Sequence, residues 1–146
     1  MDRRIALTLF SLASLATLAA VRPRVVEERQ GQPQNHQILV EIICRADGGA
    51  TTTITPWQQR VKQDDTVDWA LTEASNVAEF EIRKKQFSWL FSDAPPYRGR
   101  PGHAARAERM KGNQSGKKFS YSVNATCPNA DGTSSNIVID PDIIVD

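Results

Sequence analysis

The stretch that decides the fold reads Phe119-Ser120-Tyr121-Ser122-Val123-Asn124-Ala125-Thr126-Cys127. Apolar side chains recur at every second position of this stretch, and polar side chains fill the positions between them. In a β-strand, this alternation places one row of side chains on a core and the other row toward water. A polar turn follows, and two Ile- and Val-rich segments come after it, at residues 137–139 and 143–145. We therefore predict a C-terminal hairpin that completes a β-sandwich.

Shorter strand patterns precede this stretch, separated by turn-forming residues. They lie at residues 38–44, 51–55, 57–61, 66–71, 79–83 and 87–91. The clearest is residues 79–83, where two apolar positions alternate with three charged ones. Seven or eight short strands without a long amphipathic helix predict an all-β sandwich.

One long segment, at about residues 92–118, shows no strand pattern and is predicted to be an irregular loop. A short helical turn at residues 103–110 is compatible with its composition. Among the tryptophans, Trp69 and Trp89 are expected in the core because they fall in strand patterns. Trp57 follows Pro56 at a bend and is a candidate for an exposed aromatic.

The N-terminus has the features of a secretory signal peptide. Met1-Asp2-Arg3-Arg4 gives a short basic start, and an apolar run with small residues at its end occupies residues 5–20. The alternative, an anchor that stays in the bilayer, needs ~20 apolar residues, and this run is shorter. We predict a signal peptide at residues 1–20, a flexible leader at residues 21–37 and one domain at residues 38–146. This organisation places the mature protein in the periplasm or outside the cell.

Charge and cysteine content narrow the function classes further. Removal of residues 1–20 leaves equal numbers of basic and acidic residues. The overall electrostatic field of the mature chain therefore does not favour binding of nucleic acid. Two cysteines remain, Cys44 and Cys127, and an oxidising compartment favours a disulfide between them. Closing a loop of about 80 residues is worth about 4.5 kcal/mol in the chain-entropy model. Two buried free thiols are the alternative.

Three short motifs resemble the cupredoxins, the plastocyanin and azurin family of exported Greek-key β-sandwiches. The first runs from Pro56 through Val61 to Asp65-Thr66-Val67-Asp68-Trp69, with Asp64 where the family usually has glycine. Residues 79–82 look like the strand after the family's first ligand loop. Residues 119–123 look like its Tyr-x-Tyr-x-Cys strand. The resemblance extends over most of residues 38–146 and implies a cupredoxin-like Greek-key sandwich.

The residues at the family's copper-binding positions cannot hold the metal. A blue-copper centre uses two His, one Cys and a weak axial Met. The loop before Phe80 has no His, Val123 stands at the expected Cys position, and residues 128–136 have neither His nor Met. We therefore predict no cofactor, no metal site and no electron-transfer role.

His103 and Met110 are the only soft-ligand candidates in the long loop, and copper carriers do use both residue types. One of each, seven residues apart, is a poor set of ligands. A periplasmic copper carrier that uses His103 and Met110 is kept as the alternative function.

The same loop is strongly basic. Its only acidic residue between positions 98 and 118 is Glu108, and the basic residues there are Arg98, Arg100, Arg106, Arg109, Lys111, Lys117 and Lys118. Such a cluster on a neutral domain predicts contacts with anionic lipid or an acidic protein surface. The alternative is that these charges only keep the loop solvated. Nucleic acid is not predicted, because only Tyr97, at the edge of the segment, is available to stack on bases.

No residue set supports catalysis. A Ser–His–acid arrangement would have to use His103 or His36, which we expect to be a solvated side chain of the leader, and neither lies beside a nucleophile motif. The sequence therefore predicts an exported, copper-free, cupredoxin-like binding or structural module that is not an enzyme. Once the signal is cleaved, no membrane span is expected.

Overall fold

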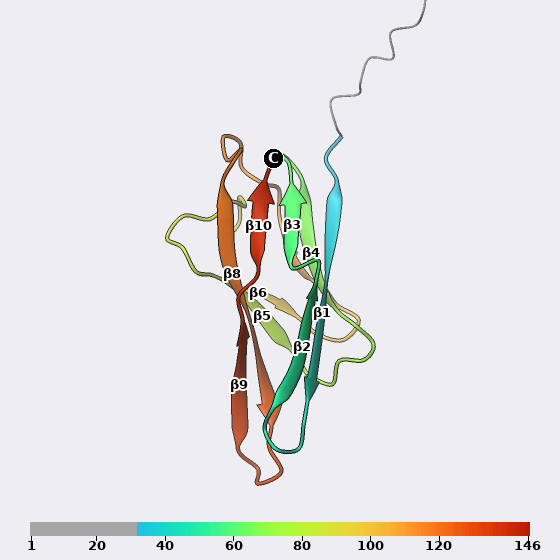
Figure 1. Ribbon diagram of the computed structural model, residues 1–146. Coiled ribbons are helices and arrows are strands. Elements are labelled where there is room, and N and C mark those ends of the chain that lie inside the picture. Colours follow the sequence, from blue (N-terminus) through green and yellow to red (C-terminus); the bar gives the residue numbers. More distant parts are fainter. Residues whose placement is uncertain (1–31) are drawn as a thin grey trace, which may run out of the picture.

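The computed structural model describes residues 32–146, so the predicted signal peptide and the leader as far as residue 31 lie outside the described residues. The described part is built from ten β-strands without a helix, which confirms the all-β prediction (Figure 1). It therefore contains no helix that could cross a membrane. The strands are β1 (Asn35–Cys44), β2 (Ala50–Thr55), β3 (Gln58–Val61), β4 (Thr66–Leu71), β5 (Phe80–Lys84), β6 (Tyr97–Gly99), β7 (Ala105–Ala107), β8 (Lys118–Pro128), β9 (Ser134–Ile139) and β10 (Asp142–Val145).

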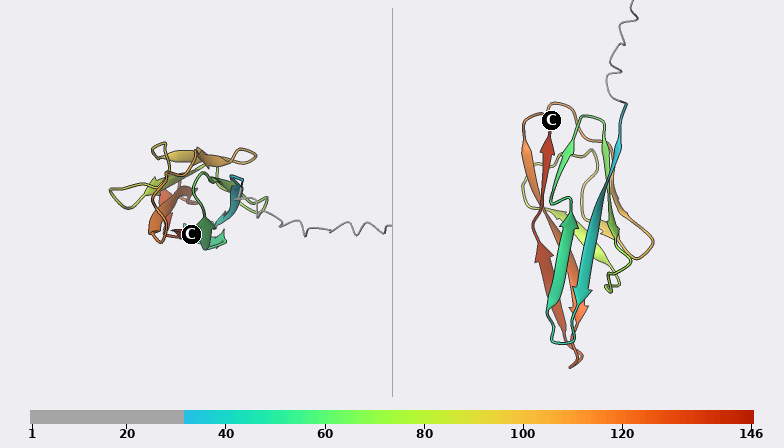
Figure 2. Two further views of the ribbon diagram at one scale, coloured as in Figure 1. Left: turned by 90° about the horizontal axis from the view of Figure 1, so that it is seen from above. Right: turned by 45° about the vertical axis from the view of Figure 1, so that its right-hand side comes forward.

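The strands form two open sheets that pack against each other as a sandwich (Figures 1 and 2). The first sheet has the order β2-β1-β4-β7, and the second has the order β3-β10-β8-β5-β6 with β9 also paired to β8. Two pairs are parallel, β1 with β4 and β3 with β10, and the others are antiparallel. Parallel neighbours cannot be joined by a tight hairpin, so the chain must cross between the sheets.

The strand predicted from Phe119 to Cys127 is present as β8, and it lies at the centre of the second sheet. Its five alternate apolar side chains, from Phe119 to Cys127, are all buried. One edge of β8 pairs with β5, and the other pairs first with β10 and then with β9. Strands β9 and β10 are thus two halves of one run along β8, interrupted at Pro141, which has no N–H to donate. The Pro141 carbonyl still accepts a hydrogen bond from the Tyr121 amide at 3.1 Å.

The chain changes sheets at Pro56, where the sequence predicts a bend. Strand β2 before it belongs to the first sheet, and β3 after it belongs to the second. The Trp57 carbonyl accepts a hydrogen bond from the Asp142 amide at 3.3 Å, which joins the crossing to β10. The Trp57 side chain is 50% exposed, as the sequence allowed.

An aromatic cluster fills the space between the sheets. Trp69 of β4 packs on Tyr97 of β6, on Tyr121 of β8 and on Phe91, with ring centroids 5.5 to 6.2 Å apart. Such pairs contribute about 0.5–1.5 kcal/mol each beyond the area they bury. Trp89 joins the cluster through Phe91, so both tryptophans expected in the core are buried.

The segment predicted as one irregular loop at residues 92–118 instead contains two short strands, β6 and β7. The helical turn considered at residues 103–110 is also absent, because β7 occupies its middle and pairs with β4. Ala105 and Ala107 face the core while Arg106 faces outward. Pairing with β4 therefore outweighs the weak helical preference of these residues. These two strands contribute to a total of ten, against the seven or eight predicted.

Two further predictions of local structure are wrong. The alternating aromatics of residues 87–91 do not form a strand, because Phe87 is fully exposed while Trp89, Leu90 and Phe91 are buried in succession. Strand β1 begins at Asn35, three residues before the predicted start, so His36 belongs to the sheet and is not a solvated leader residue.

Candidate functional site

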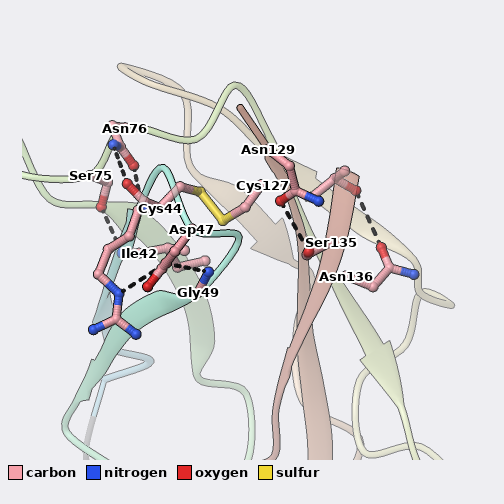
Figure 3. Close-up of a disulfide and its surroundings, with 12 residues drawn as sticks. Ile42, Cys44, Asp47, Gly49, Ser75, Asn76, Cys127, Asn129, Ser135 and Asn136 are labelled. Atoms are coloured by element: carbon pink, nitrogen blue, oxygen red, sulfur yellow. Dashed lines mark hydrogen bonds and ion pairs between the residues drawn. A yellow bond between two sulfur atoms is a disulfide. The ribbon is translucent and has the colours of Figure 1, made fainter. Parts of the chain in front are cut away.

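The predicted disulfide is present and joins the two sheets at one end of the sandwich (Figure 3). It links Cys44, the last residue of β1, to Cys127 near the end of β8, with the Cα atoms 5.4 Å apart. The Asn76 side chain brackets Cys44. Its Oδ1 accepts a hydrogen bond from the Cys44 amide at 2.7 Å, and its Nδ2 donates to the Cys44 carbonyl at 3.0 Å. At this end of the molecule, the disulfide therefore joins the two sheets, and the Asn76 hydrogen bonds hold the backbone of Cys44 in place.

The loop between β4 and β5 holds hydrogen-bonding side chains at the place where the family resemblance puts its first copper ligand. Ser75 Oγ accepts a hydrogen bond from the Ile42 amide at 3.1 Å and lies 3.2 Å from the Val40 carbonyl, to which it donates. Strand β4 ends before β1 does, so the last backbone groups on this edge of β1 have no partner strand. These side chains hydrogen-bond to those backbone groups instead. They serve the backbone, not a metal.

The expected cysteine position of the copper site is part of the core. Val123 is fully buried, and its register partners are Ile82 on one side and Ile139 on the other. Within residues 32–146, no three His, Cys, Asp or Glu side chains gather in a way that could hold a metal ion.

His103 and Met110 are not brought together. His103 closes an exposed turn with Arg100, where their backbones exchange hydrogen bonds of 2.8 and 2.9 Å. Met110 lies beyond the other end of β7, 2% exposed and paired with Phe91. Its thioether therefore belongs to the core, and the arrangement does not favour the copper-carrier alternative.

The seven predicted basic residues are divided among separate surfaces. Arg98 pairs with Glu81 at 2.8 Å on the outer face of the second sheet. Arg106 pairs with Asp68 through two bonds of 2.6 and 2.7 Å on the outer face of the first sheet. The Arg106 guanidinium, more than any other group, holds the pKa of Asp68 below its usual range. Both arginines thus have local structural roles on opposite faces.

The other five basic residues fall into two groups. At the start of β8, Lys118 pairs with Asp142 at 2.7 Å, and Lys117 Nζ donates to Gln114 at 3.1 Å. Arg100, Arg109 and Lys111 make no ion pair among residues 32–146. Together with Lys117, whose partner Gln114 is neutral, these three are the members of the predicted cluster whose charge no carboxylate neutralises.

A short backbone ladder places Arg109 and Lys111 beside the segment that follows β5. The Ser92 amide donates to the Arg109 carbonyl at 3.0 Å, and the Lys111 amide donates to the Leu90 carbonyl at 2.8 Å. Met110, between them, points into the core, so the two cationic side chains point outward on either side of it. They line a shallow depression with Arg106, Asp64 and Glu108.

The segment beside this ladder begins with three more basic residues, Arg83, Lys84 and Lys85, and then exposes Phe87. The relative exposure of Phe87 is 101%, so its ring buries nothing in the fold. Lys84 Nζ lies 5.9 Å from the centre of that ring. Sequence reasoning missed this site because it assigned Phe87 to a strand, as the first of three aromatics at alternate positions. The signal that was available is three consecutive cations just before an aromatic residue.

Another surface depression lies on the outer face of β5, β8 and β9. Polar side chains line it, including Asn124, Thr126, Asn136 and Glu81. Arg83 and Arg98 both bind the Glu81 carboxylate, and these ion pairs occupy one side of it. Arg83, more than Arg98, holds the pKa of Glu81 below its usual value.

Sequence reasoning also missed a buried carboxylate at the N-terminal end of β1. Asp65 is 4% exposed and accepts hydrogen bonds from the Gln34 and Lys62 amides, both at 2.8 Å. His36 Nε2 contacts the same carboxylate at 2.7 Å, and His36 Nδ1 lies 3.0 Å from Gln59 Nε2. Burial raises the pKa of Asp65, but the two amides and His36 outweigh it and keep that pKa below its usual value. Asp65 therefore joins β1 to the turn before β4.

Comparison with known proteins adds no family. A scan against protein-family models finds no match to this chain, and a search of the curated proteins finds none either.

Proposed function

We propose that this chain is an exported, cupredoxin-like module that binds a negatively charged partner surface without using copper. The observation that carries the proposal is the ladder between residues 90–92 and 109–111. It places Arg109 and Lys111 beside residues 90–92. That segment follows the run Arg83–Lys84–Lys85 in the sequence. Between positions 83 and 118 the acidic residues are only Asp93 and Glu108, and Asp64 also lines the depression beside Arg109 and Lys111. A field of one sign concentrated on part of a neutral domain attracts partners of the opposite sign.

The cupredoxin-like part of the proposal rests on the motifs that suggested it. Pro56 lies where the chain changes sheets, and Trp69 is in the core on β4. Tyr121 and Val123 lie on the central strand of the second sheet. With Val123 packed between Ile82 and Ile139, we propose a scaffold that has kept the architecture of the family and not its metal.

Export is supported by the Cys44–Cys127 bridge together with the N-terminal sequence pattern. Disulfides persist in oxidising compartments and are rare in the cytosol. We propose a periplasmic or secreted location, and a role in binding and not in catalysis.

The test compares two pairs of substitutions that remove the same charge. Arg109→Ala/Lys111→Ala removes the two available cations of the ladder. Arg45→Ala/Lys62→Ala removes two exposed cations outside the basic segment. Binding of the full chain to poly-glutamate and to phosphatidylglycerol vesicles is measured for both pairs. Each cation near an anionic surface contributes about 1 kcal/mol, so we expect the first pair to weaken binding about 30-fold.

The control pair is expected to retain most of the wild-type affinity, and binding of wild type is expected to weaken as salt is added. An equal loss in both pairs would mean that only net charge matters and would overturn the proposed site. Arg98 and Arg106 are left unchanged in this test, because each neutralises a carboxylate of the fold.

A further inference from the structure

A single aromatic ring projects from the flank of the sandwich with no packing role. The connection from β5 to β6 leaves the body of the molecule as an extended loop (Figures 1 and 2). Phe87, within this loop, is the most exposed of the large hydrophobic residues, well above Trp57 at 50%. Burial of a Phe side chain contributes ~1.5–3 kcal/mol, and exposed Phe87 does not provide this stabilisation to the fold. We therefore expect a partner that buries it.

The loop is anchored at both ends, which holds the ring in place. Ile82 before it and Trp89 after it are both buried. Trp89 Nε1 donates to the Tyr97 hydroxyl at 2.8 Å, and Lys84 Nζ donates to the Phe87 carbonyl at 3.3 Å. The ring is therefore presented on a fixed support, and little conformational entropy is lost when it binds.

The charges around Phe87 are mostly positive. Arg83, Lys84 and Lys85 precede it, and Lys111 is joined to Leu90 three residues after it. Two carboxylates lie among these cations, where Glu81 pairs with Arg83 and Asp140 pairs with Lys85. Lys84 and Lys111 have no such partner within residues 32–146. The excess is cationic.

The size of the apolar surface favours lipid over protein as the partner. A stable protein interface buries about 1,200–2,000 Å² and has a packed apolar centre. Here the apolar surface is one ring with Pro95 and Pro96, which line a small depression beside Arg83 and Lys84. An aromatic ring in the interface and lysines at the level of the headgroups combine an apolar with an electrostatic contribution to reversible binding to an anionic bilayer.

We propose that Phe87 inserts into the interfacial region of an anionic phospholipid bilayer while Lys84 and Lys111 contact the headgroup phosphates. This inference rests on the proposed function, since it specifies the partner of the same basic region. The inference adds Phe87 to the residues that contact the partner. It also specifies the partner as a lipid bilayer, which the charges alone do not identify.

The experiment measures cosedimentation of the full chain with vesicles of phosphatidylglycerol or of neutral phosphatidylcholine. Every variant carries the same N-terminus as the wild type, so that segment contributes equally to all. Phe87→Ala is expected to weaken binding to phosphatidylglycerol about tenfold, and Lys84→Ala about fivefold. Trp57→Ala, the other exposed aromatic, is the matched control and should leave the affinity unchanged. Phe87 has no contacts in the core, so its variant should melt at the wild-type temperature.

A second measurement reports insertion directly. The variant Phe87→Trp is mixed with phosphatidylglycerol vesicles that contain brominated acyl chains, and its fluorescence quenching is compared with that of the wild type. Additional quenching in the variant supports insertion. No additional quenching, or full affinity of Phe87→Ala, overturns the inference. If poly-glutamate binding still depends on Arg109 and Lys111, the proposed function survives; if the wild type binds neither vesicles nor poly-glutamate, both fail.

Discussion

His36 Nε2 lies 2.7 Å from a carboxylate oxygen of Asp65, and this contact fixes the first residues of β1 against the turn that leads into β4. The same carboxylate accepts two backbone amides, so three donors converge on a group that is almost fully buried. Asp65 is therefore one of the groups that hold the start of β1 in place.

Replacing that side chain should destabilise the fold. Asp65→Asn puts an NH2 group where the carboxylate accepts hydrogen bonds, so at least one buried amide loses its acceptor. Hydrogen bonds to charged groups contribute ~1.5–3 kcal/mol each, and we expect a loss of about 2–3 kcal/mol in the free energy of unfolding. Urea denaturation measures it. Asp64→Asn is the matched control, because asparagine tolerates the positive φ of residue 64, and it should change stability by less than about 0.5 kcal/mol.

The stability of the fold should fall in acid. The pKa values of Asp65, Asp68, Glu81 and Asp142 are all lower in the folded chain than their usual values. A carboxyl group with a lowered folded pKa stabilises the fold above its unfolded pKa, about 4, and loses that contribution as the pH falls through the folded pKa. We expect the urea midpoint to be constant from about pH 7 to 5 and to decrease below pH 4.

Arg106 provides a specific check on this pH dependence. Because its guanidinium is the main cause of the low pKa of Asp68, Arg106→Ala should move that pKa back toward its usual value. An NMR titration of the Asp68 carboxyl carbon measures the change. An unchanged Asp68 pKa in Arg106→Ala would contradict the assigned cause.

The disulfide should be a major source of stability. Cys44→Ser/Cys127→Ser is expected to lower the free energy of unfolding by ~2–5 kcal/mol, because the bridge restricts the unfolded chain and joins both sheets. Thermal unfolding with and without reductant measures the same effect in the wild type. A thiol assay on unfolded, unreduced protein should find no free thiol, and finding two per chain would contradict the bridge.

Copper binding should be absent or adventitious. His103 is exposed and Met110 is buried beyond the other end of β7, so the two cannot form one ligand set. Protein prepared with added copper should carry less than one equivalent by mass spectrometry, and His103→Ala should not change that content. A stoichiometric metal that is lost in His103→Ala would restore the copper-carrier alternative.

The parts of this structure that could be predicted from sequence are those with local, regular signals. The alternation of apolar and polar residues from Phe119 to Cys127 predicted β8, and the alternation of charged and apolar residues at positions 79–83 predicted β5. Pro56 predicted the bend at which the chain crosses between the sheets. The disulfide was predicted from the presence of only two cysteines in a chain for which export was also predicted.

The candidate site could not be predicted in the same way, because its contacts join distant residues. The basic segment looked like one cluster until Glu81 and Asp68 were found to neutralise Arg98 and Arg106. The role of His36 depends on Asp65, 29 residues away. Phe87 fits a strand pattern, and only the tertiary structure reveals that its ring faces away from the protein.

Charge reversal on the ladder is the most direct test of the central claim. The affinity of the full chain for phosphatidylglycerol vesicles is measured at low salt for the wild type, for Arg109→Glu/Lys111→Glu and for Arg45→Glu/Lys62→Glu. We predict that reversal at 109 and 111 reduces binding by at least 100-fold, as expected from about 1 kcal/mol for each cation lost and a similar repulsion for each anion gained. We also predict that the second variant binds nearly as well as the wild type. Equal binding by the two variants would contradict the claim that this surface recognises an anionic partner.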